Sequence, residues 1–309
     1  MIKSISIINY LNNMVTMELT RPELSNFLID SIDGLGPAKA NINTTEMATS
    51  DGALYNSARL SARNIVLNLI FITEGVNSEG KILSIEDIRQ KSYKYFPIKR
   101  NLTFIIKTDN RTLVTTGYVE SNEPSISSDQ EGCAISIICT DPYFYSLDSE
   151  TTLFYGVDPN FEFPFSNESL TEDLIEFGII ENKQENVVTY YGDADVGVTI
   201  VVNAVGSVTN LKIYNSGTRE VMSIDSTKLA NLTGHGIIYG DQITICTVKG
   251  KKSVYLWRDG ININILNALG KDIDWFTLAR GDNIFAFTAD VGATNLQFRV
   301  YNQIIYEGA

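Results

Sequence analysis

Along most of this chain, apolar and polar residues alternate with a period of two, and the alternation is interrupted by Gly, Asn and Asp. This pattern is typical of half-buried strands joined by tight turns. The first half holds five predicted strands, at residues 2–10, 63–73, 101–107, 112–120 and 133–140. The second half holds seven, at residues 187–191, 197–205, 210–214, 237–248, 253–257, 283–288 and 295–306. The pattern therefore predicts a mainly β protein.

One segment has the spacing of a helix instead. Ser84 can accept hydrogen bonds from the free N–H groups of a helix start, and the acidic Glu86 and Asp87 follow in the first turn, where they complement the helix dipole. Pro97 ends the segment, because proline cannot continue a helix. A second segment, residues 171–177, fits a helix or a strand equally well.

A domain boundary is predicted near Tyr145. Pro142 prevents a central strand from continuing, because proline lacks the N–H group that strand pairing needs. Residues 146–164 are then rich in turn formers. The expected domains are residues 1–145, a β-rich domain with one short helix, and residues 146–309, a sandwich of short strands.

Composition and charge narrow the class of protein. The 309 residues are 44% hydrophobic, and the formal net charge is −13. Nucleic acid is not an expected partner, because phosphate binding needs clustered Lys and Arg, and this chain has more acidic than basic residues. Residues 1–13 lack the apolar stretch of a signal peptide, and no run approaches the roughly 18 apolar residues of a membrane helix. We therefore expect a protein made in a cytoplasm, without membrane insertion.

The three cysteines, Cys133, Cys139 and Cys246, are expected to be reduced. Cys133 and Cys139 lie six residues apart in one predicted strand, which separates them by roughly 20 Å. A disulfide tolerates only about 7 Å between Cα atoms. All three are predicted to be small buried apolar side chains.

No catalytic, cofactor or metal site is predicted. His235 is the only histidine and lies between two glycines, which indicates a turn. Zinc needs about four clustered Cys or His ligands, and the chain has four such residues in total, widely scattered. Gly34-x-Gly36 is followed by Pro37 rather than by the third glycine of a nucleotide loop.

Two Asp-x-Asp pairs, at positions 193/195 and 272/274, are the remaining acidic candidates. Paired carboxylates serve glycosidases and calcium sites. Neither pair is followed by the full calcium-loop pattern, so both are interpreted as turns or solvated edges, with calcium as the alternative. The chain is therefore not expected to be an enzyme.

Two groups are candidates for binding. Arg59, Arg63 and Asn64 flank the long apolar strand core at residues 65–71, where guanidinium groups can pair with carboxylates of a neighbouring subunit. Ordinary solvation at a strand end explains them equally well. Trp257, Tyr190 and Tyr255 can form an aromatic shelf that stacks on sugar rings. The alternative is that these large aromatics belong to a core.

The order of several short motifs resembles the distal tail protein (Dit) family of phages of Gram-positive hosts and related phage-tail-like particles. In the first half these are Gly-Leu-Gly-Pro at 34–37, Asp-Gly-Ala-Leu-Tyr at 51–55, the strand at 60–69 and Cys-Thr-Asp-Pro-Tyr-Phe at 139–144. In the second half they are Tyr-Gly-Asp at 191–193, residues 275–287 and the last strand at 296–308.

The resemblance implies a ring-forming N-terminal β domain, barrel-like or sandwich-like, and a galectin-like C-terminal β-sandwich whose last strand, about 296–309, packs back on the first domain. It implies a homo-hexamer, as a single or stacked ring, at the virion tail tip. The expected partners are the tail tube protein, a tail-associated hub protein and receptor-binding or baseplate proteins. The alternative function is a lectin-like module that binds host-surface carbohydrate.

Overall fold

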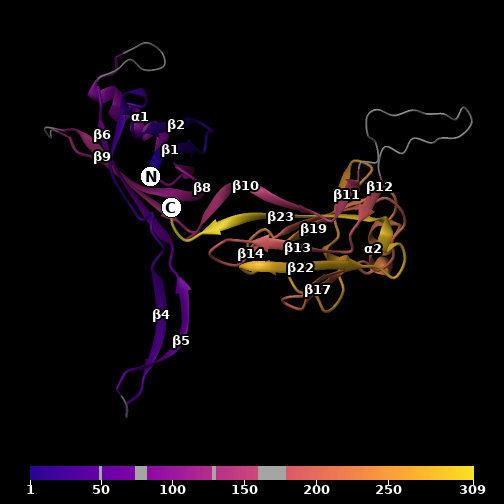
Figure 1. Ribbon diagram of the computed structural model, residues 1–309. Coiled ribbons are helices and arrows are strands. Elements are labelled where there is room, and N and C mark those ends of the chain that lie inside the picture. The colour runs from indigo at the N-terminus through magenta and orange to yellow at the C-terminus, as the bar shows by residue number, and fades with distance from the viewer. Residues whose placement is uncertain (49–50, 74–81, 127–129, 159–178) are drawn as a thin grey trace, which may run out of the picture. The chain divides into compact units, whose positions relative to one another are not determined.

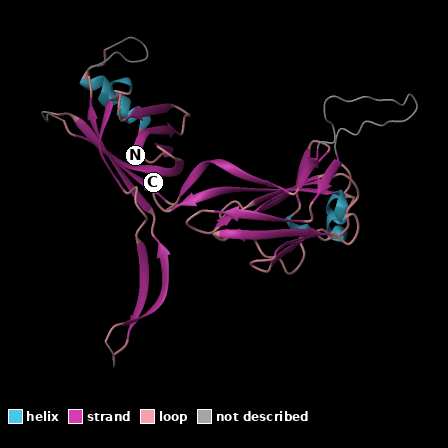
Figure 2. Cartoon of the chain, viewed as in Figure 1, coloured by secondary structure: helices cyan, strands magenta, loops and turns pink. Residues whose placement is uncertain are grey.

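The computed structural model describes residues 1–48, 51–73, 82–126, 130–158 and 179–309. The ambiguous segment 171–177 lies outside them. The described chain is mainly β, as predicted (Figure 2). It forms two compact units, Met1–Leu147 with Ile305–Ala309, and Asp148–Ile304.

The first unit is built on an antiparallel sheet with the strand order β2-β1-β7-β8-β9-β6-β3. Figure 1 labels β1, β2, β6, β8 and β9 of this sheet. Its strands are β1 (Ile2–Asn9), β2 (Met14–Glu18), β3 (Phe27–Asp33), β6 (Arg63–Phe71), β7 (Asn101–Thr108), β8 (Thr112–Pro124) and β9 (Gly132–Cys139). The five strands predicted in this half are confirmed. β2 and β3 were not predicted, and neither was the 3₁₀ turn Pro22–Leu24.

Alternation along these strands gives the first unit its core. In β6, Ile65, Leu67 and Leu69 are buried, whereas Asn64 is exposed. The helix α1 (Ile85–Tyr95) buries Ile88 and Ser92. Its start is capped as predicted: the Ser84 hydroxyl accepts from the Asp87 N–H, and the Asp87 carboxylate accepts from the Ser84 N–H.

A separate hairpin, β4 (Ala40–Glu46) and β5 (Ala53–Leu60), also belongs to the first unit. The two strands pair with each other and with no other described strand. The alternation of apolar and polar residues did not predict either of them.

The second unit is a sandwich of two antiparallel sheets. One sheet has the order β23-β15-β18-β19-β20 and the other β13-β22-β16-β17. The first sheet consists of β15 (Thr199–Ala204), β18 (Gln242–Cys246), β19 (Ser253–Arg258), β20 (Ile261–Asn264) and β23 (Leu296–Tyr306). The second consists of β13 (Glu185–Tyr190), β16 (Lys212–Asn215), β17 (Glu220–Ser223) and β22 (Gly281–Thr288).

Aromatic rings fill the space between the two sheets. Phe287 of β22 stacks on Phe298 of β23, with ring centroids 3.9 Å apart and planes 12° from parallel. Phe154 packs against both rings. The inward faces of these strands therefore form one core, and their outward faces remain available for other roles.

The remaining elements are the ten-residue strand β10 and several shorter ones. They are β10 (Phe144–Leu153), β11 (Tyr155–Asp158), β12 (Ile179–Asn182), β14 (Val196–Gly197), β21 (Thr277–Leu278), the helix α2 (Ser226–Thr233) and the 3₁₀ turns Leu266–Ala268 and Ala293–Asn295. The strand predicted at 237–248 covers only Gln242–Cys246. α2 was missed, although Asp225 caps its start and Gly234, with φ of 85°, ends it.

Candidate functional site

The β4–β5 hairpin presents two different exposed faces. Opposed residues of an antiparallel pair share a face, so the pairs Asn41–Arg59 and Asn43–Ser57 lie on one face of the hairpin. The other face holds the pairs Ala40–Leu60 and Ile42–Ala58 and, past a register shift between Asn43 and Thr44 that moves Tyr55 to the face opposite Ser57, the pair Thr44–Tyr55. At the tip of the hairpin, Glu46–Ala53 continues this face and Thr45–Leu54 continues the first. We call these the amide face and the apolar face. All residues of the two strands are exposed except Leu60, which is half-buried.

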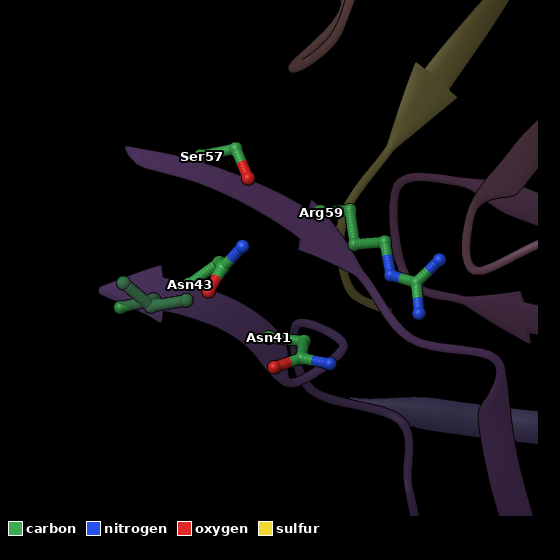
Figure 3. Close-up of a pocket in the computed structure, with 5 residues that line it drawn as sticks. Asn41, Asn43, Ser57 and Arg59 are labelled. Atoms are coloured by element: carbon green, nitrogen blue, oxygen red, sulfur yellow. The ribbon is translucent and has the colours of Figure 1, made fainter. Parts of the chain in front are cut away.

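The amide face surrounds a shallow hollow of about 390 Å³ (Figure 3). It is lined by Asn41, Asn43, Ser57 and Arg59 of this face, and by Ile42, whose strand position assigns its side chain to the other face. A two-stranded ribbon supplies only one wall, so a ligand here would lie on a surface and not in a cleft. Amides, a hydroxyl and a guanidinium donate and accept hydrogen bonds, but without a carboxylate or histidine they offer no acid–base chemistry.

The apolar face is unusual for a free surface. Ile42 is 60% exposed and Tyr55 is 67% exposed. A lone two-stranded hairpin is at best marginally stable in water. An unpaired sheet edge is also a template for association with another chain. The apolar face thus has the properties of a surface that another molecule covers.

The three interface candidates lie in different surroundings. Arg59 is exposed on the amide face, and Asn64 is exposed on β6, where its side-chain oxygen accepts from the Ser136 hydroxyl at 3.0 Å. Arg63, by contrast, is only 3% exposed.

The buried Arg63 guanidinium binds the chain's own backbone. It donates to the carbonyl oxygens of Gly34, Gly36, Pro142 and Glu307, and it lies 4.3 Å from the centre of the Phe144 ring. These bonds use all three guanidinium nitrogens, so Arg63 is not free to pair with a carboxylate of a neighbouring subunit. That expectation is corrected: Arg63 ties the 34–36 loop and the C-terminal residues to β6.

The proposed aromatic shelf divides in the same way. Trp257 is 47% exposed and Tyr255 is 36% exposed. Both face outward from β19, because Val254 and Leu256, which alternate with them along the strand, are fully buried. Tyr190 is fully buried, and its hydroxyl donates to the Ala194 carbonyl at 2.8 Å. Tyr190 is therefore a core residue and no part of a shelf.

The other candidate residues from the sequence lie on the exposed surface. His235 is exposed directly after α2, in a turn as predicted. The carboxylates at 193, 195, 272 and 274 are all exposed. Among the described residues, no group of three or more His, Cys, Asp or Glu side chains is arranged to hold a metal ion. No helix in the described part of the chain has the length and apolarity to cross a membrane.

The cysteines are all free. Cys133 and Cys139 are buried, as predicted, and burial raises the pKa of the Cys133 thiol to about 12. Cys246 is partly exposed, which corrects the expectation of three buried thiols. The reason is register: Ile243 and Ile245 of β18 point into the core, so Cys246 lies on the opposite face.

This architecture matches that of a protein of known structure. The crystal structure of the SPP1 Dit protein (gp 19.1) matches over 98% of this chain and 99% of the SPP1 chain, with a TM-score of 0.64 at 14% sequence identity. The chain has the Dit fold. Chains of the phage p2 baseplate in its activated conformation, with Sr and with Ca, match over 97% and 98% of this chain, each at 9% identity and a TM-score of 0.47. No family model and no curated protein matches the sequence.

Within this Dit fold, the β4–β5 hairpin was not predicted from the alternation of apolar and polar residues. Its strands contain Asn, Thr, Ser and Ala next to single large apolar residues, which gives a weak periodic signal. The one sequence signal that touched it was the Asp-Gly-Ala-Leu-Tyr motif at 51–55, whose last three residues begin β5.

Proposed function

We propose that this chain is a structural protein of a phage tail tip, in which six copies close a ring that joins the tail tube to the host-adsorption apparatus. The fold supports this role, because the SPP1 protein with the same fold is described as a paradigm of the hub adsorption apparatus in phages that infect Gram-positive hosts. The role is structural and not enzymatic.

The exposed β4–β5 hairpin is the observation that carries the proposal. Full burial of a large apolar side chain contributes about 1.5–3 kcal/mol. Ile42 and Tyr55 both lie on the apolar face and are largely exposed within the chain. Covering them against a second copy would supply the stabilisation that an isolated hairpin lacks.

The contact would be between two different surfaces, the hairpin of one copy and another part of the next. Contacts of this kind generate a ring when the rotation closes and a filament when it does not. In the ring, Arg59 on the amide face and Asn64 on β6 are the remaining interface candidates. The ring would contact the tail tube protein on one side, and the tail-associated hub and receptor-binding or baseplate proteins on the other, at the virion tail tip.

The test is the mass of the purified chain, measured by native mass spectrometry and light scattering. We expect a hexamer or stacked hexamers for the wild type and monomers for Ile42→Lys and Tyr55→Lys, since a charge on the apolar face opposes its burial. Thermal unfolding of the separate units should change little in these variants, because both residues are exposed.

Val291→Lys is the matched control, because Val291 is also a β-branched residue and is 64% exposed in the second unit. It should leave the assembly intact. A wild-type chain that stays monomeric at every concentration, or a ring that survives both hairpin substitutions, would refute a ring closed through the hairpin.

A further inference from the structure

The outward face of the β15-β18-β19-β20 sheet in the second unit carries a regular array of side chains. Trp257 of β19 lies opposite Gln242 of β18 on one side and Asn262 of β20 on the other. Since opposed residues share a face, these three side chains form one row across the sheet.

A parallel row lies two residues along the strands. Tyr255 is opposite Thr244 on β18 and Asn264 on β20. The two aromatic rings thus form a column along β19, with hydrogen-bonding side chains on both sides. Positions i and i+2 of a strand lie roughly 7 Å apart, so Tyr255 borders the Trp257 row on one side.

The first row continues across the sheet. Asn203 of β15 lies opposite Gln242, and Gln297 of β23 lies opposite Asn203. The row therefore reads Gln297, Asn203, Gln242, Trp257 and Asn262 over five adjacent strands. At about 4.8 Å per strand it spans on the order of 19 Å, which suits a short chain of rings better than a single small molecule.

The row has no charged side chain, although the whole chain has a net charge of −13. In the neighbouring row, Arg299 of β23 is the one ionic side chain, opposite Val201. An uncharged surface of amides in a strongly acidic protein favours an uncharged, hydrogen-bonding ligand over an ionic one.

The amides are partly fixed in place before any ligand binds. The Gln242 side-chain nitrogen donates to the Asn203 side-chain oxygen at 2.9 Å. The Asn264 side-chain oxygen accepts from the Leu266 N–H at 3.0 Å. In the described part of the chain, Asn262 makes no side-chain hydrogen bond, so its oxygen and both its N–H donors face solvent.

We propose that this face binds a neutral oligosaccharide that lies across the strands along the row, with one sugar ring stacked on Trp257. A pyranose ring offers C–H groups on its flat faces and hydroxyls around its rim. The face of an aromatic ring packs against these C–H groups. Amide groups both donate hydrogen bonds to the hydroxyls and accept hydrogen bonds from them. Gln242 and Asn262 are the residues that hydrogen-bond the hydroxyls on either side of the stacked ring.

The experiment uses the full-length chain and an array of neutral oligosaccharides of glucose, galactose, N-acetylglucosamine and rhamnose, with oligogalacturonate as the anionic control. Array hits are titrated by calorimetry and by tryptophan fluorescence. We expect saturable binding of a neutral oligosaccharide, at least 10-fold weaker in Trp257→Ala and several-fold weaker in Asn262→Ala. Trp257→Phe, which keeps an aromatic face, should retain most of the affinity.

Tyr239→Ala is the matched control, because Tyr239 is a 78% exposed aromatic of the same unit outside the rows. It should bind like the wild type. No saturable binding of any neutral sugar, equal binding by Trp257→Ala, or a preference for oligogalacturonate would each overturn the proposal. If Trp257→Ala changes the assembly mass and not sugar binding, the face is a protein interface, and the proposal is wrong. The proposed ring is tested separately, since its variants lie in the hairpin.

Discussion

Replacing Arg63 by methionine should destabilise the first unit more than any surface change, because one guanidinium holds three segments together. Its Nη1 atom donates to Gly34 O at 2.7 Å and also to Gly36 O. Nε and Nη2 donate to Pro142 O at 2.9 and 2.7 Å, and Nη2 donates to Glu307 O at 2.5 Å. Methionine has similar length but donates to none of these four carbonyl oxygens.

The magnitude follows from those bonds. A hydrogen bond to a charged group contributes about 1.5–3 kcal/mol, and a buried acceptor left without a donor costs about 1–3 kcal/mol. Two effects reduce the sum: water can reach some of the carbonyls, and burial lowers the pKa of the Arg63 guanidinium, a sign of its desolvation cost. We expect a net loss of about 3–5 kcal/mol in the free energy of unfolding. For a unit of about 150 residues that lowers Tm by roughly 6–20 °C.

The two units can be followed separately, because both tryptophans, Trp257 and Trp275, lie in the second unit. Circular dichroism reports on both units and tryptophan fluorescence on the second. Arg63→Met should lower the first unit's transition and leave the fluorescence transition in place. Arg63→Lys should lose most of the same stability, since one ammonium group cannot reach four carbonyls.

The control is Arg59→Met, in which the same chemical change is made on the exposed amide face of the hairpin. Surface changes of this kind stay within about 0.5 kcal/mol. If the free energies of unfolding of Arg63→Met and Arg59→Met differ by less than about 1 kcal/mol, the interpretation of Arg63 as a structural tie is wrong.

Two further predictions concern buried groups. Arg258→Met should lower the free energy of unfolding of the second unit, followed by tryptophan fluorescence, by about 3–5 kcal/mol. The reason is that the buried carboxylate of Asp241 loses its ion pair with Arg258, at 2.6 Å; an unchanged transition would contradict this. In the native chain, a thiol reagent at pH 8 should modify Cys246 and leave Cys133 and Cys139 unmodified until urea is added. Such reagents react with the thiolate form, and burial raises the pKa of the Cys133 thiol to about 12. Fast labelling of all three thiols would refute it.

The elements that the sequence predicted share a physical feature: each has one face in a core. β6 shows this most clearly, since Ile65, Leu67 and Leu69 alternate with residues that are more exposed. The start of α1 was predicted because the capping signal at Ser84 and Asp87 is local. Such features need only a few neighbouring residues, so they are readable from the chain alone.

Arg63 shows where that reasoning stops. At the start of a strand, an arginine has the same sequence signature whether its guanidinium reaches solvent or a neighbour's carboxylate. Its partners are backbone carbonyls, which carry no residue-type signal, and one of them, Glu307, is 244 residues away. The bend that places them depends on Gly34, whose φ of 83° and 1.9 Å approach of a hypothetical Cβ to Asn64 O exclude a side chain.

Tyr190 is a different case, because a local signal existed. Val188 and Tyr190 are two residues apart on β13 and both are fully buried, whereas Tyr191 after the strand is 68% exposed. A strand that begins at 185 assigns Tyr190 to the same face as Val188. The residue type suggested an aromatic shelf, but the strand register places the Tyr190 side chain in the core.

The hairpin marks the limit of single-chain reasoning. Ordering the backbone of one residue costs about 1–2 kcal/mol, and the two strands together order fifteen residues with no core beneath them. Hydrogen bonds between two strands rarely balance that cost in water. The apolar face would offset the remaining ordering cost only when Ile42 and Tyr55 are buried by another molecule. A weak alternation that leaves both faces exposed is therefore what we expect of a strand pair whose apolar face is covered by another copy of the chain, as in the proposed ring.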